Sequence, residues 1–209
     1  MKLYTRNASN YCFKTEWSLY ELGIEDFERI PNQGDHDTDG MTKLAAATPI
    51  LTTIPTLIDK NGLVLTESSV IIQYLADTRN IDTSFFPKDP ATRAKILQWD
   101  RFCDFEAAKA LGALYYNSPD YLKGAAPATW EVEQAQKDIP VIEKKLEAVL
   151  SKQKYITSDR HFTYADAALA SNIFFMQWFG IKWTQPSVVR WLTDCTSRPA
   201  FKKRLDLIK

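Results

Sequence analysis

The chain has 209 residues, a formal net charge of zero and 25% charged residues. This length allows one large domain or two small ones, each with enough surface to bury a core. The balanced charge argues against electrostatic binding to nucleic acid or to an anionic membrane. No apolar run reaches the ~18 residues that a membrane-spanning helix needs, so we expect no membrane partner.

Three cysteines, Cys12, Cys103 and Cys195, are spread along the chain. Their odd number and wide spacing do not make a disulfide framework and fit a reducing cytosol. The first residues, Met-Lys-Leu-Tyr-Thr-Arg, lack the apolar core of a secretory signal. The sequence therefore predicts a cytoplasmic globular protein.

The N-terminal part begins with a strand, a helix and a second strand. Residues 2–5 and 26–30 have strand character, and residues 11–22 have the pattern of a helix. Ser9 and Asn10 are both good N-cap residues for that helix. A β-α-β order of this kind needs a parallel crossover.

Residues 35–46 match the first half of a calcium-binding loop. Residues 35–40 read Asp-His-Asp-Thr-Asp-Gly, like the start of an EF-hand. The twelfth position, which holds a bidentate glutamate in that motif, is Ala46. We interpret the segment as a solvated acidic loop and predict no metal site.

Residues 51–77 predict a hairpin and then a helix. Short strand runs at 56–58 and 63–65 flank an Asn-Gly pair within residues 60–62, which is a strong signal for a two-residue turn. Pro55 directly precedes the first run, cannot donate to a ladder, and is a candidate for a cis peptide bond.

A helix then starts at Thr66 or Glu67, with apolar residues at helical spacing. If a weak helix also lies near residues 42–47, the N-terminal part has the order βαβαββα, which is the thioredoxin-like order. The fold class we predict is therefore α/β for this part.

Helices are predicted for the remainder of the chain. Turn-forming residues at 79–90 indicate a linker. We expect a thioredoxin-like domain over residues 1–78 and an all-helical domain over residues 91–209. One apolar stripe with steps of three and four residues consists of Ile96, Trp99, Cys103, Ala107, Ala110 and Leu114.

A buried helix is predicted after residue 163. Thr163 and Asp166 have the spacing of a capping box, and residues 167–179 are apolar nearly all round, as in a buried helix. We therefore assign Asp166 a structural role.

Residues 51–77, with Ile-Pro-Thr-Leu, Asp-x-x-Gly, Glu-Ser-Ser-Val-Ile and Tyr-Leu, resemble the glutathione-binding half of the cytosolic glutathione transferases. The resemblance extends to Ser-x-x-x-x-Lys at residues 9–14 and Glu-Leu-Gly at residues 21–23. It implies a thioredoxin-like domain followed by a helical bundle, usually in a homodimer. Thr5 stands where one group of classes has tyrosine, so the chain is similar to the serine-type theta, zeta and phi classes, with the class itself not assigned.

The resemblance implies a glutathione site. Ile54, before a cis Pro55, would pair its backbone with the cysteinyl part of glutathione, and Glu67 and Ser68 would hold the γ-glutamyl end. A zwitterionic amino acid needs a carboxylate for its ammonium and a hydroxyl with free N–H groups for its carboxylate. The alternative is that Glu67 and Ser68 only start a helix.

The glycyl end of glutathione has a less definite partner. Family members commonly have a basic residue two positions before the proline, and here that position is Thr53. We include Thr53 among the expected glutathione-binding residues, and Lys43 is the alternative.

The resemblance also implies a catalytic residue at position 9. A hydroxyl that donates to sulfur at a helix N-terminus favours the thiolate, which is the nucleophile. We expect Ser9 to be that donor, with Asn10 as the second candidate, while the alternative role for Ser9 is that of a simple N-cap. Cys12 lies inside the helix and outside the catalytic register, and no Cys-x-x-Cys motif is present.

We therefore predict a glutathione transferase that conjugates the glutathione thiolate to a small, hydrophobic electrophile. That electrophile would lie between the two domains against Tyr115, Tyr116, Trp178 and Trp183, although aromatic residues also dominate cores. A glutathione-dependent peroxidase or disulfide reductase, and a non-catalytic binding protein, are the alternatives on the same fold.

Overall fold

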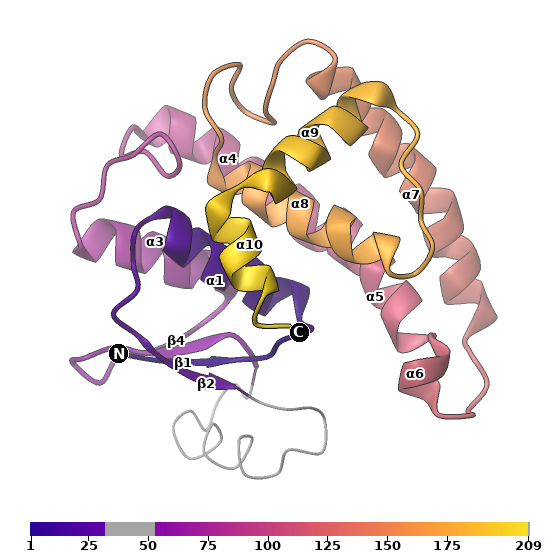
Figure 1. The fold of residues 1–209 in the computed structure, drawn as a ribbon, viewed down its shortest axis with the longest axis horizontal. Helices are drawn as coiled ribbons and strands as arrows, with labels where there is room; N and C mark the ends of the chain where they lie inside the picture. The colour runs from indigo at the N-terminus through magenta and orange to yellow at the C-terminus, as the bar shows by residue number, and fades with distance from the viewer. Residues whose placement is uncertain (32–52, 209) are drawn as a thin grey trace. The chain divides into compact units, whose positions relative to one another are not determined.

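The structure, a computed structural model, describes residues 1–31 and 53–208. The chain divides into two compact units. The first unit consists of Met1–Lys88 and the segment that begins at Pro199, and the second is Asp89–Arg198. The elements of the first unit are β1 Lys2–Thr5, α1 Asn10–Glu21, β2 Glu28–Pro31, β3 Thr56–Ile58, β4 Val64–Thr66, α3 Ser68–Thr78 and α10 Pro199–Leu205 (Figure 1).

The described strands form one mixed sheet in the order β2-β1-β3-β4. β1 pairs parallel to β2 and antiparallel to β3, and β3 pairs antiparallel to β4. Helices α1 and α3 pack against each other, and α10 packs against α1 (Figure 1). The predicted thioredoxin-like domain followed by a helical domain is confirmed. The helix expected near residues 42–47 and the acidic segment 35–46 lie outside the described residues.

The strand register brings three chain segments to one edge of the sheet. Tyr4 pairs with Thr56, and Thr56 pairs with Thr66. The end of β1, the start of β3 and the end of β4 are therefore neighbours, about 4.8 Å apart from strand to strand. The segments that leave the sheet at this edge lead to Ser9 and to Glu67.

α1 ends just before Gly23, as the position of this glycine in the sequence predicts. Gly23 has a φ of 70°, the left-handed conformation that glycine adopts without steric cost. The Ile24 N–H donates to the Leu19 carbonyl at 2.8 Å, and the Gly23 N–H donates to the Tyr20 carbonyl at 3.1 Å. These two bonds define a Schellman motif.

The hairpin between β3 and β4 is longer than the two-residue turn that the sequence predicts. Its last ladder pair is Ile58 with Val64, so residues 59–63 form the connection. Gly62 has a φ of 84°, and the Asn61 side chain accepts a hydrogen bond from the Leu63 N–H at 3.0 Å. The Asp59 N–H donates to the Leu63 carbonyl at 2.9 Å and the Gly62 N–H donates to the Asp59 carbonyl at 3.0 Å, so the turn centres on Lys60 and Asn61 and Gly62 follows it.

The second unit contains helices only. Residues 90–116 form one continuous helical segment, and its middle part, residues 103–107, is π-helical. The sequence has one unbroken apolar stripe along this segment and does not indicate the π-helical part. There Cys103 donates through sulfur to the Ala168 carbonyl at 3.1 Å and accepts from the Asn172 amide at 3.0 Å. The elements of this unit are α4 Pro90–Phe102, η1 Cys103–Ala107, α5 Ala108–Tyr116, α6 Pro119–Leu122, α7 Thr129–Leu150, α8 Tyr164–Gln177 and α9 Pro186–Ser197.

The capping box at the start of α8 is present as predicted. Asp166 is fully buried. Its Oδ2 accepts from the N–H and the hydroxyl of Thr163, at 2.8 and 2.9 Å. Its Oδ1 accepts from the Ile156 N–H and from the Trp191 indole, both at 2.8 Å. Burial raises the pKa of the Asp166 carboxyl, and these hydrogen bonds counteract that rise.

No helix in the described ranges is both long and apolar enough to cross a membrane. The predicted domain limits at residues 78 and 91 stay a prediction.

Candidate functional site

Ser9 is the N-cap of α1. Its backbone is extended, and its Oγ accepts a hydrogen bond from the Cys12 N–H at 3.3 Å. This bond uses an oxygen lone pair and leaves the hydroxyl hydrogen available for donation. The two roles considered for Ser9, N-cap and sulfur donor, are therefore compatible. Asn10, the second candidate donor, is the first residue of α1 and is half-buried.

Cys12 is not an accessible nucleophile. It is fully buried in α1. Burial raises the pKa of its thiol, although the hydroxyls of Ser9 and Thr5 act in the opposite direction. Cys103 and Cys195 are also buried, so every thiol of the chain is shielded from solvent.

The peptide bond between Ile54 and Pro55 is cis. Pro55 is buried and Ile54 is half-buried directly before β3. Thr56 donates its hydroxyl to the Thr53 carbonyl, which closes this short turn on itself. Thr53 is exposed, and its only described hydrogen bond uses the backbone rather than the side chain.

Glu67 has a backbone conformation that side-chain-bearing residues rarely adopt. It is the N-cap of α3, with φ 68° and ψ 117°, and its side chain makes no capping bond. Such conformations are costly and cluster at functional sites. Glu67 is exposed, while Ser68 is 4% exposed at the first position of α3. The carboxylate is thus presented to solvent beside the amides of a helix N-terminus.

The site residues predicted from sequence therefore lie on three segments at one sheet edge. Ser9 follows β1, Pro55 precedes β3 and Glu67 follows β4, and the ladder pairs these strand ends directly. A helix N-terminus, a backbone turn and a carboxylate are thereby combined. This combination suits an extended, zwitterionic peptide.

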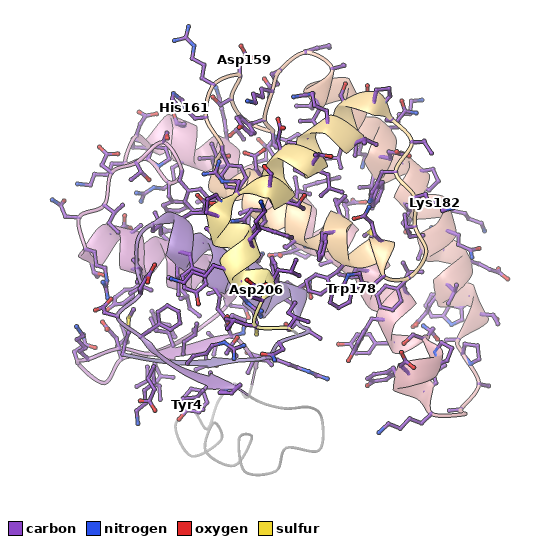
Figure 2. All side chains as sticks on the ribbon, viewed as in Figure 1. Tyr4, Asp159, His161, Trp178, Lys182 and Asp206 are labelled. Atoms are coloured by element: carbon purple, nitrogen blue, oxygen red, sulfur yellow. The ribbon has the colours of Figure 1, made fainter. Side chains whose placement is uncertain are left out.

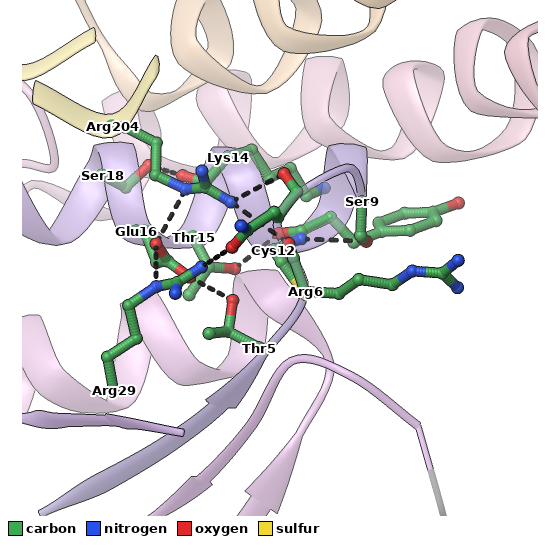
Figure 3. Close-up of polar contacts among 12 residues, drawn as sticks. Thr5, Arg6, Ser9, Cys12, Lys14, Thr15, Glu16, Ser18, Arg29 and Arg204 are labelled. Atoms are coloured by element: carbon green, nitrogen blue, oxygen red, sulfur yellow. Dashed lines mark hydrogen bonds and ion pairs between the residues drawn. The ribbon is translucent and has the colours of Figure 1, made fainter. Parts of the chain in front are cut away.

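A buried charged cluster beneath this edge was not foreseen. Glu16 on α1 lies between Arg29 of β2 and Arg204 of α10 (Figure 3). Its Oε2 is 3.1 Å from Arg29 Nε and 2.8 Å from Arg204 Nε, and Thr5 donates its hydroxyl to Oε1. Glu16 and Arg204 are fully buried. No local sequence signal pairs them, because they come from opposite ends of the chain.

The aromatic candidates belong to the second unit. Tyr116 and Trp178 are 55% and 49% exposed, and Figure 2 marks Trp178 at the end of α8. The half-buried Tyr115 packs its ring against Tyr116, with centroids 5.2 Å apart. Trp183, by contrast, is 8% exposed and donates its indole N–H to the Ile173 carbonyl at 3.0 Å. Trp183 is therefore a core residue.

Residues 1–31 and 53–208 contain no group of three or more histidine, cysteine, aspartate or glutamate side chains that could hold a metal ion.

Two family models match the chain. Residues 3–83 match "Glutathione S-transferase, N-terminal domain", and residues 102–199 match "Glutathione S-transferase, C-terminal domain". Together they cover most of each unit. This similarity supports glutathione transferase activity in general terms.

Individual relatives agree with the family models. The chain is 29% identical over 206 residues to glutathione S-transferase U19 of Arabidopsis thaliana, which covers 94% of this chain and 85% of the relative. It is 26% identical over 160 residues to a probable glutathione S-transferase of Nicotiana tabacum, covering 77% of this chain and 64% of that protein. A solved glutathione transferase homologue from Lodderomyces elongisporus, described with two glutathione molecules per subunit, has a TM-score of 0.85 and 25% identity, with 100% of this chain and 98% of the other covered.

Proposed function

Because the chain belongs to the glutathione S-transferase family, we propose that its first unit binds glutathione and that Ser9 stabilises the glutathione thiolate for attack on an electrophilic carbon. The observation that carries this proposal is the convergence of Ser9, Pro55 and Glu67 at one sheet edge. These residues are far apart in sequence, and the strand register brings the segments that carry them to the same edge of the sheet.

Glutathione would lie across this edge. The Glu67 carboxylate would bind the γ-glutamyl ammonium, and the Ser68 hydroxyl with the first amides of α3 would bind its carboxylate. The backbone of Ile54 would pair with the cysteinyl part. Thr53 would bind the glycyl end of glutathione. The solved relative that is described with two glutathione molecules per subunit supports this ligand.

Ser9 would act by lowering the pKa of the bound thiol. A free thiol has a pKa of about 8.5 and is mostly protonated at neutral pH. A hydroxyl that donates to the sulfur favours the charged form, and so does the N-terminal end of α1. The thiol proton leaves to solvent, and the thiolate forms a bond to carbon. The leaving group departs from that carbon with its electron pair.

The buried cysteines favour conjugation over chemistry at a protein thiol. A disulfide reductase of the glutaredoxin kind needs an accessible, low-pKa cysteine. Here all three thiols are buried, and burial raises the pKa of Cys12.

We further propose a cytosolic homodimer, and contact of Tyr115, Tyr116 and Trp178 with the apolar part of the electrophile.

The test compares Ser9→Ala and Asn10→Ala with the wild type in conjugation of glutathione to an activated chloronitrobenzene. Thr78→Val is the control, because it removes an exposed hydroxyl at the far end of α3 that bonds only the Tyr74 carbonyl. We expect Ser9→Ala to lower kcat by roughly 10²-fold, the size of a lost positioned donor. Glutathione affinity by calorimetry should stay within about twofold, since the γ-glutamyl contacts remain.

Equal rates in Ser9→Ala and wild type would exclude Ser9 as the donor. A loss in Asn10→Ala alone would assign the role to Asn10. Absence of conjugation together with absence of glutathione binding in the wild type would refute the proposed function.

A further inference from the structure

We propose that Arg204, on the C-terminal helix α10, is a positioning residue for Ser9. This inference rests on the proposed function. It concerns how the turn that carries Ser9 is held, and it assigns the buried Glu16–Arg29–Arg204 cluster a part in thiolate stabilisation.

The Arg204 side chain binds backbone carbonyls of the turn between β1 and α1. One guanidinium nitrogen, Nη2, donates to the carbonyls of Arg6 and Asn7 at 3.2 and 3.1 Å. These carbonyls lie three and two residues before Ser9 in the sequence. Among residues 1–31 and 53–208, the pairing of β1 ends at Thr5, before this turn.

The same guanidinium is anchored on α1. Its Nε lies 2.8 Å from Glu16 Oε2, and its central carbon lies 4.9 Å from the centroid of the Phe13 ring. Since α1 also carries the amide that bonds Ser9 Oγ, Arg204 links the turn and the helix whose junction is Ser9. A planar fork can make these contacts together, whereas a lysine ammonium cannot.

Arg29 also supports the turn, through a side chain. Its Nη2 donates to the Asn7 side-chain oxygen at 2.5 Å, while its Nε donates to Glu16 at 3.1 Å. Two arginines therefore share one carboxylate and both reach the turn (Figure 3). Thr5 donates to the remaining Glu16 oxygen, which completes the connection from β1 to α1.

The cluster also has an electrostatic consequence. Two guanidinium groups and one carboxylate leave one net positive charge, and Arg204 Nη1 is buried with no hydrogen-bond partner among the described residues. A positive charge near a bound thiol favours its ionised form. Arg204 would therefore lower the thiol pKa both by positioning the Ser9 hydroxyl and by its charge.

The experiment measures the pKa of the glutathione thiol in the binary complex by thiolate absorbance, for wild type, Arg204→Met, Arg204→Lys and Asn7→Ala. Lys203→Met is the matched control, because Lys203 is the preceding residue of α10 and pairs instead with the exposed Glu25 at 2.7 Å. Calorimetry gives glutathione affinity for each variant, and urea titration confirms that each is folded.

We expect Arg204→Met to raise the bound thiol pKa toward about 8.5, the free value, and to lower kcat roughly tenfold or more, as for a small misplacement of a catalytic group. Glutathione affinity should change by less than about threefold, since the γ-glutamyl contacts are elsewhere. Arg204→Lys should recover part of the pKa shift through its charge. Asn7→Ala should raise the pKa without removing the Glu16–Arg204 pair, and Lys203→Met should match the wild type.

An unchanged thiol pKa in a folded Arg204→Met would overturn the inference while leaving the proposed function intact. If Arg204→Met does not fold, Arg204→Lys decides, because lysine keeps the charge but loses the planar fork that holds the two carbonyls: a bound thiol pKa equal to that of the wild type would overturn the inference. A wild type that binds glutathione without lowering its thiol pKa would overturn the proposed function, and this inference with it.

Discussion

Arg204 and Glu16 form an ion pair in which both side chains are fully buried, with Arg204 Nε 2.8 Å from Glu16 Oε2. The pair joins α10, close to the C-terminal end of the chain, to α1 and β1 at the beginning. Because buried charges are costly without a partner, the first unit depends on a helix that follows the whole second unit in sequence.

The first prediction concerns this carboxylate. Glu16→Gln leaves Arg204 and Arg29 without their shared anion and should destabilise the protein by about 3–5 kcal/mol, the usual cost of breaking a buried ion pair. Glu25→Gln, which removes an exposed partner of Lys203, should cost less than about 1 kcal/mol. Urea unfolding measures both. Similar midpoints for the two variants would contradict the importance of the buried cluster.

The second prediction concerns glutathione recognition. Glu67→Gln keeps the shape of the side chain but removes the charge that would bind the γ-glutamyl ammonium. Hydrogen bonds to charged groups contribute about 1.5–3 kcal/mol, so glutathione affinity should fall roughly 10- to 100-fold. Asp77→Asn, at the opposite end of α3, is the control for loss of one negative charge. An unchanged dissociation constant for Glu67→Gln in calorimetry would remove Glu67 from the site.

The third prediction concerns Asp166. Asp166→Asn replaces one carboxylate oxygen by an amide that cannot accept, so at least one buried donor among Thr163, Ile156 and Trp191 loses its partner. Each such loss costs about 1–3 kcal/mol, in addition to the weakened helix cap. Denaturant unfolding should show this decrease, whereas Asp159→Asn, in an exposed loop, should be near neutral. Equal stabilities would exclude Asp166 as a structural centre of the second unit.

The fourth prediction concerns pH. Hydrogen bonds from Arg79 and Lys60 hold the pKa of Asp26 well below its usual range. The unfolded chain therefore takes up a proton at this residue before the folded chain does, and stability falls as the pH drops below about 4, the unfolded value for aspartate. Arg79→Gln should make the urea midpoint less sensitive to pH in that range. An identical acid dependence in wild type and variant would contradict this assignment.

Much of the fold could be predicted because its signals are local. Ser9, Gly23 and the Thr163–Asp166 pair act over three or four residues, so their roles at helix ends can be predicted from the sequence, and each makes a helix-end contact typical of its residue type. The position of the turn near Gly62 could be predicted, but its length could not, because the backbone bonds that close it join Asp59 to Gly62 and Leu63 and centre the turn one residue before the Asn-Gly pair.

Contacts between distant segments could not be predicted. Glu16, Arg29 and Arg204 become neighbours only through the sheet and through the packing of α10 on α1. The π-helical segment at Cys103 adds a residue without disturbing the apolar spacing that indicates a helix. Trp178 and Trp183 have equal apolar character, and only the structure shows one exposed and the other in the core.

Stabilisation of the glutathione thiolate by this protein is tested most directly by the pKa of the thiol when it is bound to the wild type, measured by thiolate absorbance over a pH titration at saturating glutathione. We expect an apparent pKa well below the value of about 8.5 for a free thiol. A bound thiol pKa at or above that value, or no binding at millimolar glutathione, would contradict this expectation.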